Sequence, residues 1–274
     1  MMRSSRLVVE PSPGELVTEV VYIVPGADGS PPRYATLPVT VHRVHGFSTP
    51  RALVVTGDLQ YFAAATSDTS PILLGVSLAD TLASLAGSSV LPDTDHVAVV
   101  LTGDYYADPA GTMGASGPID SVWSAFAQRF PWVVGVLGNH DQFESNSGLR
   151  HERSVQVMQT LDSTETVVGD LTIAGVGGIM GNPRRPGRRT QAEYLSEVMR
   201  MSARQPDVLV LHETPAIPEM RLRGSETLRE HLEATPPLMV CCGHVHWTTP
   251  IVLLNSGTIV VNADMRCVVL IGAE

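Results

Sequence analysis

Acidic, amide and imidazole side chains recur in this chain of 274 residues, each time after a short apolar segment. Five such segments are followed by residues able to bind a metal ion or move a proton, namely Asp58, Asp104, Asn139 with His140, His212, and His244 with His246. Carboxylates, a neutral amide oxygen and imidazoles suit a borderline divalent ion such as Mn, Fe, Zn or Co. Two such ions, about 3.5 to 4 Å apart, can clamp a phosphoryl group and lower the pKa of a bridging water. If the five segments bring these residues together, they form a site for divalent metal ions.

The elements that must position these residues alternate between strand and helix patterns. Short apolar runs predict strands at 52–56, 96–102, 132–137, 207–211 and 238–242. Apolar residues at helical spacing predict helices at 72–85, 119–130, 190–203 and 225–232. Strands joined by crossover helices pair in parallel, and ligands of such sheets bind beyond the carboxyl ends of the strands. The polar residues are therefore expected to converge on one edge of the fold.

The remaining segments favour further β-structure within one domain. Hairpins are expected from residues 16–24 with 35–44, and within residues 167–177. The sequence contains no internal repeat, low-complexity tract or linker. We therefore expect a single α/β domain over residues 1–274. Its parts are an N-terminal β-hairpin extension at 1–50, a core with the motifs at 52–246 and a C-terminal β meander at 251–271.

Composition limits the partners and the location of the chain. There are 18 Lys and Arg against 28 Asp and Glu, a formal net charge of −10, which argues against general binding to nucleic acid or anionic membranes. Hydrophobic residues make up 43% and charged residues 17%, which predicts a folded chain with a sizeable core. The odd number of cysteines, two of them adjacent, favours a reducing compartment. Without an apolar run long enough for a signal sequence or a membrane span, the sequence is expected to be cytoplasmic.

The order of the motifs resembles that of the calcineurin-like metallophosphoesterases. The matching segments are GDLQ at 57–60, GD at 103–104, GNHD at 138–141, His212 and GHVH at 243–246. The resemblance implies a four-layer α/β/β/α sandwich with mixed sheets and two divalent metal ions. It also implies hydrolysis of a phosphomonoester or phosphodiester, in a small-molecule or nucleotide substrate, by attack of a metal-bridging hydroxide.

The resemblance also implies a role for each matching residue. Carried over position by position, it assigns Asp104 to bridge both ions, Asp58 and His246 to the first ion, and Asn139, His212 and His244 to the second. His140 would lie outside the metal shell as a proton donor to the leaving oxygen, or as a charge on the phosphoryl group. Asp141 would orient the ring of His140.

The sequence departs from the family pattern at three places. Gln60 stands where the family usually has a histidine, so the first ion is expected to bind more weakly or to be a harder metal, with Gln60 reaching it directly or through water. GDYYADP at 103–109 lacks the pattern of the Ser/Thr protein phosphatases, which argues against that branch. NADMR at 262–266 replaces the Asn-Pro-Gly turn of many relatives and suggests no function by itself.

Two groups of residues are candidates for substrate binding. Arg184, Arg185, Arg188 and Arg189 form a basic cluster that is either a solvated loop or a recognition site for phosphate. Tyr105, Tyr106 and Trp247 directly follow proposed metal ligands and either line a pocket or pack in the core. Two other functions stay open: a scaffold without catalytic activity, which Gln60 favours, and a metal-dependent hydrolase of another substrate class.

Overall fold

The structure is a computed structural model that describes residues 7–10, 14–26, 30–64, 71–88, 90–112, 114–144, 150–153 and 156–272. Its first sheet has ten strands within these residues. In spatial order they are β10 (Arg150–Arg153), β11 (Gln156–Thr160), β8 (Trp132–Gly135), β6 (Val97–Leu101), β4 (Ala52–Gly57), β20 (Arg266–Gly272), β3 (Arg33–His45), β2 (Glu15–Val24) and β5 (Phe62–Ala63), with β1 (Val8–Val9) paired to β3. Strands β4, β6, β8 and β11 are parallel, and β2 and β3 form the expected antiparallel hairpin.

The second sheet lies against the first. Its order is β12 (Thr164–Val168), β13 (Leu171–Val176), β16 (Val208–Leu211), β17 (Met239–Cys242), β19 (Ile259–Asn262) and β18 (Ile251–Leu253). The four central strands are parallel, and β12 pairs antiparallel with β13 as the expected hairpin. Two short pairs lie outside both sheets: β14 (Ile179–Met180) with β15 (Arg188–Arg189), and β7 (Gly117–Pro118) with β9 (Asp141–Gln142).

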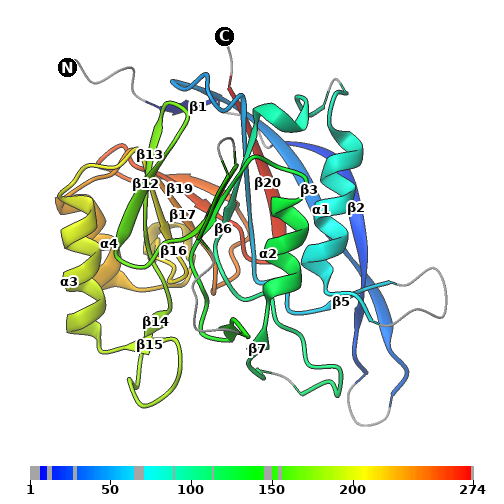
Figure 1. Cartoon of the computed structure of the whole chain (residues 1–274). Helices are drawn as coiled ribbons and strands as arrows, with labels where there is room; N and C mark the ends of the chain where they lie inside the picture. Colours follow the sequence, from blue (N-terminus) through cyan, green and yellow to red (C-terminus); the bar gives the residue numbers. More distant parts are fainter. Residues whose placement is uncertain are drawn as a thin grey trace.

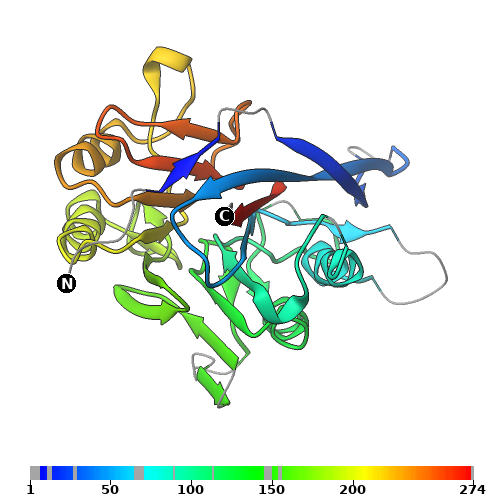
Figure 2. The same ribbon diagram turned by 90° about the horizontal axis from the view of Figure 1, so that it is seen from above.

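Helices cover the outer face of each sheet, so the molecule has four layers. The helices are α1 (Leu74–Leu85), α2 (Asp120–Ala127), α3 (Gln191–Ser202) and α4 (Glu226–Ala234), with 3₁₀ turns η1 (Thr94–His96) and η2 (Pro218–Met220). In the view from above, α3 and α4 lie on one side of the strands and α1 and α2 on the other (Figures 1 and 2). This is the four-layer sandwich with mixed sheets that the resemblance implies.

The alternation of side chains along the buried strands explains the layers. Val54 of β4 packs in the core under α1 and α2, whereas its neighbour Val55 points into the core between the sheets. Leu209 and Val210 of β16 divide in the same way between the core under α3 and α4 and the core between the sheets. Because successive side chains of a strand point to opposite faces, an uninterrupted apolar strand can serve two cores.

The C-terminal segment crosses from one sheet to the other. Strands β18 and β19 belong to the second sheet, whereas β20 inserts into the first sheet, antiparallel to β4 and parallel to β3. The structure therefore differs from the single meander expected at 251–271. The crossing occupies residues 263–265, between β19 and β20, at the edge where the candidate site lies. Among the described residues, no helix combines the length and the apolar character needed to span a membrane.

Candidate metal centre

The motif residues follow the carboxyl ends of strands from both sheets. Asp58, Asp104 and Asn139 come after β4, β6 and β8 of the first sheet, and His212 and His244 come after β16 and β17 of the second. Hydrogen bonds join these strand ends across the sheets. The amide of His244 donates to the carboxylate of Asp58 at 2.9 Å, and Nδ1 of His212 lies 2.8 Å from the carbonyl oxygen of Thr102. The convergence that the sequence predicts at one edge is present.

Three of these residues have left-handed backbone conformations. The φ angles of Asp58, Asp104 and His244 are 57°, 59° and 68°. A non-glycine residue in this region costs on the order of 1–3 kcal/mol, and such residues cluster at functional sites. At each of these residues the chain turns away from the direction of the preceding strand. Three of the candidate ligands are therefore held in strained turns at the edge that carries the site.

Asp104, His212 and His244 form a group that can hold a metal ion. Their potential ligand atoms all lie within 4.8 Å of one another, and Nε2 of His212 is 3.3 Å from a carboxylate oxygen of Asp104. The contact between His212 Nδ1 and the Thr102 carbonyl assigns a proton to Nδ1, so Nε2 is the nitrogen that would bind a metal after losing its own proton. The group contains Asp104, the carboxylate that the resemblance assigns to both ions, and two of the three residues that it assigns to the second ion, His212 and His244.

Unpartnered polar atoms show that this group fits a cation. Both side-chain polar atoms of Asn139, and Nε2 of His212, are buried and have no hydrogen-bond partner among the described residues. A buried polar atom left without a partner costs about 1–3 kcal/mol, so such atoms are rare in folded proteins. A metal ion bound by the amide oxygen and the imidazole nitrogen would give these two atoms a partner and remove that part of the cost. The donor set of one carboxylate, one amide oxygen and two imidazoles suits a borderline divalent ion.

The electrostatics of the site also favour a cation. Burial opposes protonation of His212, but the charges of Asp104 and Asp58 outweigh it and raise its pKa to about 10. Burial, together with the charges of Asp264 and Asp104, raises the pKa of Asp58 well above its usual value. Burial and the neighbouring His212 lower the pKa of His244 to about 4, which keeps its imidazole neutral. The carboxylates therefore attract positive charge, and a divalent ion would replace the proton on His212.

Asp141 acts on the backbone of the site. Its two oxygens accept hydrogen bonds from the amides of Asp104, Tyr105 and Gly138 at 2.6, 2.7 and 3.0 Å. Burial and the charge of Asp104 raise its pKa to about 6. The ring of His140 receives none of these bonds, and its Nδ1 has no hydrogen-bond partner in the described part of the chain. The structure therefore differs from the expectation that Asp141 orients His140.

Among the residues assigned to the first ion, His246 contacts other side chains through both of its ring nitrogens. His246 lies with Nδ1 at 3.1 Å from a carboxylate oxygen of Asp264 and with Nε2 at 3.0 Å from a guanidinium nitrogen of Arg266. Gln60 lines the same cavity as Asp58. Both ring nitrogens of His246 are thus engaged by residues that the sequence analysis did not select.

Three buried charged residues at the site were missed by sequence reasoning: Glu213, Asp264 and Arg266. Glu213 accepts a hydrogen bond from the amide of Met180 at 2.9 Å and lines a cavity of about 410 Å³ with His244 and His246. The available signals were weak. Glu213 directly follows His212, and Asp264 follows a buried strand in the same way as the five selected positions.

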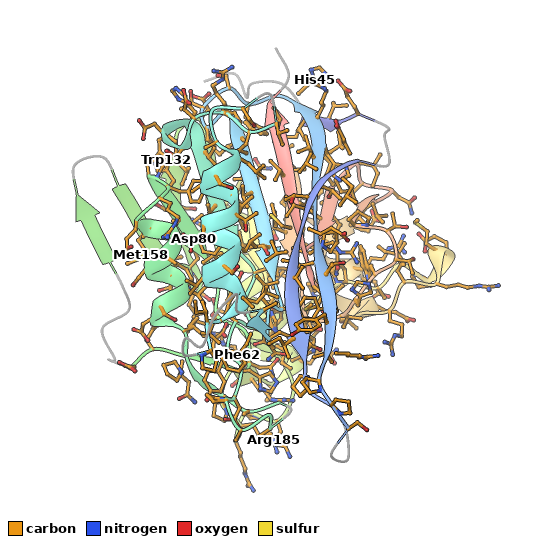
Figure 3. All side chains as sticks on the ribbon, turned by 90° about the vertical axis from the view of Figure 1, so that its right-hand side faces the viewer. His45, Phe62, Asp80, Trp132, Met158 and Arg185 are labelled. Atoms are coloured by element: carbon orange, nitrogen blue, oxygen red, sulfur yellow. The ribbon has the colours of Figure 1, made fainter. Side chains whose placement is uncertain are left out.

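A cavity of about 310 Å³ opens beside the candidate ligands. Its polar wall contains Asp58, Gln60, Asp104, His140, His244 and Asp264. Its apolar wall includes Ile23, Tyr61, Phe62, Tyr106, Ala107 and Met265. The ring of Tyr106 lies against Gly117, where an added Cβ atom would fall 2.3 Å from the ring. Phe62 of this wall and Arg185 lie toward the same end of the molecule, opposite His45 (Figure 3).

The structure separates the candidates for substrate binding. Tyr105 and Trp247 have 0% exposure, and they donate hydrogen bonds to the carbonyl oxygens of Thr56 and Arg223 at 2.6 and 2.7 Å. Both therefore belong to the core, which is the second of the two roles that the sequence left open, and neither lines the cavity, which corrects their assignment to substrate binding. The adjacent Tyr106 lines the cavity instead.

The four arginines of the basic cluster have different surroundings. Arg189 pairs with both oxygens of Asp162 at 2.6 and 2.7 Å. Arg188 is half-buried and lines a neighbouring cavity of about 350 Å³ with Gly138. Arg184 and Arg185 are exposed. The charge of Arg188 acts on a candidate ligand, because it contributes to the lowered pKa of His244.

A family model and a solved structure are similar to this chain. A family model described as calcineurin-like phosphoesterase matches residues 37–248. Among solved structures, the crystal structure of TT1561 of Thermus thermophilus is similar, with a TM-score of 0.49 and 16% sequence identity over 78% of this chain and 90% of that chain. A search of curated proteins finds no match. The span of the family model includes every motif residue from Asp58 to His246.

Proposed function

The chain belongs to the calcineurin-like phosphoesterase family, and we propose that it is a metal-dependent hydrolase of a phosphoric monoester or diester. The observation that carries the proposal is a set of buried polar atoms without a hydrogen-bond partner, both of those of Asn139 and Nε2 of His212, beside Asp104 and His244. These four residues would hold one divalent ion, and Asp58 would contribute to a second. Bound ions would lower the pKa of water and offset the charge of the phosphoryl group.

His140 is the proposed proton donor to the leaving oxygen. It lines the cavity together with Asp58, Asp104 and His244, and its amide donates to a carboxylate oxygen of Asp104 at 2.9 Å. This bond holds the backbone of His140 next to the group that binds the metal. Because Nδ1 of His140 has no partner among the described residues, the ring is free to direct a proton toward bound substrate.

The apolar wall of the cavity supports a proposal about the ester alcohol. Tyr61, Phe62 and Tyr106 provide aromatic surface in the same cavity as the metal ligands. Aromatic side chains stack on planar groups with favourable energy. We therefore propose an alcohol with an aromatic or nucleoside character, and a phosphoryl group that lies at the polar wall.

The first experiment measures metal content and hydrolysis together. The protein is reconstituted with Mn²⁺ and screened against aryl monoesters and diesters, nucleotides, cyclic nucleotides and sugar phosphates. Asp104→Asn is expected to remove both the bound metal and the activity. His140→Asn is expected to keep the metal but to slow turnover by about 10²–10⁴-fold, most strongly for poor leaving groups.

Two outcomes would contradict the proposal and favour the alternatives. A folded protein that binds no metal and hydrolyses none of the esters would indicate a scaffold. Activity restricted to substrates without phosphorus would indicate another hydrolase. Unchanged turnover of a natural ester by His140→Asn would overturn only the role of His140.

A further inference from the structure

We propose that Asp264 is a ligand of the first metal ion and takes the place of the histidine that is missing at position 60. This inference rests on the proposed function, because it assumes that Asp58 binds an ion. It adds a residue outside the stretch that the motifs span, on the segment that crosses between the two sheets.

The fold places Asp264 at the same edge as the other ligands. Asp264 follows β19, which is parallel to β17, so it leaves its strand at the same end as His244 leaves β17. Its backbone forms a parallel bridge with Gly57, the residue before Asp58, and the next amide, of Met265, donates to the Gly57 carbonyl oxygen at 3.2 Å. The side chains of Asp58 and Asp264 both line the cavity. The two carboxylates therefore belong to one site.

The carboxylate of Asp264 has an oxygen available for a cation. The residue is only 8% exposed, and one oxygen lies 3.1 Å from Nδ1 of His246. The other oxygen accepts no hydrogen bond from the residues that the structure describes. Burying a carboxylate is costly unless it is paired or coordinates a metal. A divalent ion held by Asp58 and Asp264 would offset the negative charge of both carboxylates at the cavity wall.

The other residues near Asp58 are less suited to this position. Gln60 offers a neutral amide oxygen, and Nε2 of His246 lies against the guanidinium of Arg266. Asp264 provides a charged oxygen instead. Replacing an imidazole by a carboxylate makes the donor set harder, so the first ion is expected to be Mn²⁺ or Mg²⁺ in preference to Zn²⁺.

The test counts Mn²⁺ ions per chain by elemental analysis and isothermal titration, and detects neighbouring ions by the coupled signal of two Mn²⁺ in electron paramagnetic resonance. The wild type is expected to bind two ions. Asp264→Asn is expected to keep the second ion tightly bound, to bind the first ion at least tenfold more weakly, and to lose the coupled signal. Asparagine can still accept the hydrogen bond from His246, so a residue that only orients His246 would leave both ions bound.

Two further variants complete the design. Gln60→His in the Asp264→Asn background is expected to restore binding of the first ion, because it supplies the ligand that the family usually has. Asp108→Asn changes a carboxylate that lines the same cavity in an exposed loop, and it is expected to leave two ions bound. If Asp264→Asn folds poorly, the single variant Gln60→His tests the inference instead. With Asp264 present, it is expected to bind two ions and to shift the metal preference of the first site toward Zn²⁺.

The outcomes separate the inference from the proposed function. Two ions in Asp264→Asn with unchanged affinity, or an unchanged metal preference in Gln60→His, would overturn the inference while the function stands. A wild type that hydrolyses esters with one ion would overturn it as well. A wild type that binds no Mn²⁺ and hydrolyses no ester would overturn the proposed function, and the inference with it.

Discussion

At the scale of single residues, Asp141 connects the ends of two strands. Its carboxylate accepts three amide hydrogen bonds, one from Gly138 after β8 and two from Asp104 and Tyr105 after β6. In Asp141→Asn, one oxygen becomes an amide group that cannot accept these bonds. Because an unsatisfied buried donor costs about 1–3 kcal/mol, we expect a loss of about 2–4 kcal/mol in the free energy of unfolding.

Urea unfolding of the metal-free protein measures this loss. Asp162→Asn is a matched control, since it removes an acidic partner of Arg189 at the exposed surface and should cost no more than about 1 kcal/mol. Equal stabilities of the two variants would contradict the role of Asp141 as a buried acceptor.

Trp247 and Tyr106 are both close to motif residues in the sequence, but Trp247 is buried in the core and Tyr106 lines the cavity. Trp247→Phe is expected to lower stability by about 1–3 kcal/mol, because it shortens a fully buried ring and removes its bond to Arg223, and to leave KM unchanged. Tyr106→Ala removes a cavity wall and is expected to raise KM for aromatic esters. Steady-state kinetics and thermal unfolding distinguish the two. A raised KM in Trp247→Phe would indicate that Trp247 contacts the substrate, and would contradict its assignment to the core.

Single residues show where sequence reasoning succeeds and where it stops. The order of Asp58, Asp104 and His212 along the chain was sufficient to select them, because parallel strands bring such positions to one edge. The sequence did not distinguish Tyr105 from Tyr106, since the direction of a side chain after a strand depends on the local turn. Asp264 was missed because its proximity to Asp58 depends on a pairing between residues more than 200 positions apart.

At the scale of elements, the loop between β14 and β15 supports Asn139. Gly187 in this loop has φ of 63°, and an added Cβ atom would lie 2.6 Å from the Cα of Asn139. Gly187→Ala is therefore expected to push the loop away from Asn139 and to weaken the binding of metal. The left-handed conformation adds a cost of about 1–2 kcal/mol to the free energy of unfolding.

Gly181→Ala tests the specificity of this effect within the same loop. Its added Cβ atom would meet only the flexible side chain of Arg188, at 3.3 Å, and its φ is not in the left-handed range. We expect near-normal affinity for Mn²⁺ in isothermal titration. If both variants bound Mn²⁺ as the wild type does, the loop would have no part in positioning Asn139.

The elements were easier to predict than their order in the sheets. Helix α3 was expected at 190–203 and is present at Gln191–Ser202, where Thr190 and Glu193 form a capping box. The apolar residues of β20 indicated a strand, but its position between β3 and β4 could not be read from the sequence. Strand order depends on contacts between distant segments, which local periodicity does not encode.

At the scale of the whole molecule, the site joins the two sheets. Asp58, Asp104 and Asn139 belong to the first sheet, and His212 and His244 belong to the second. Ions bound by both sets would bind the folded state and not the unfolded chain. At free metal one hundred times above Kd, such binding adds about 2.7 kcal/mol to stability. For a protein of this size we expect a rise in Tm of about 5–11 °C, since each kcal/mol shifts Tm by roughly 2–4 °C.

Differential scanning calorimetry with excess EDTA and with Mn²⁺ measures this rise. Asp104→Asn serves as the control, because a variant without the shared carboxylate is expected to show almost no shift between the two conditions. An equal shift in Asp104→Asn and the wild type would mean that Mn²⁺ stabilises the protein at another place. A shift confined to the wild type would instead locate the stabilising ions at the contact between the carboxyl ends of the two sheets, where the ligands from each sheet face one another.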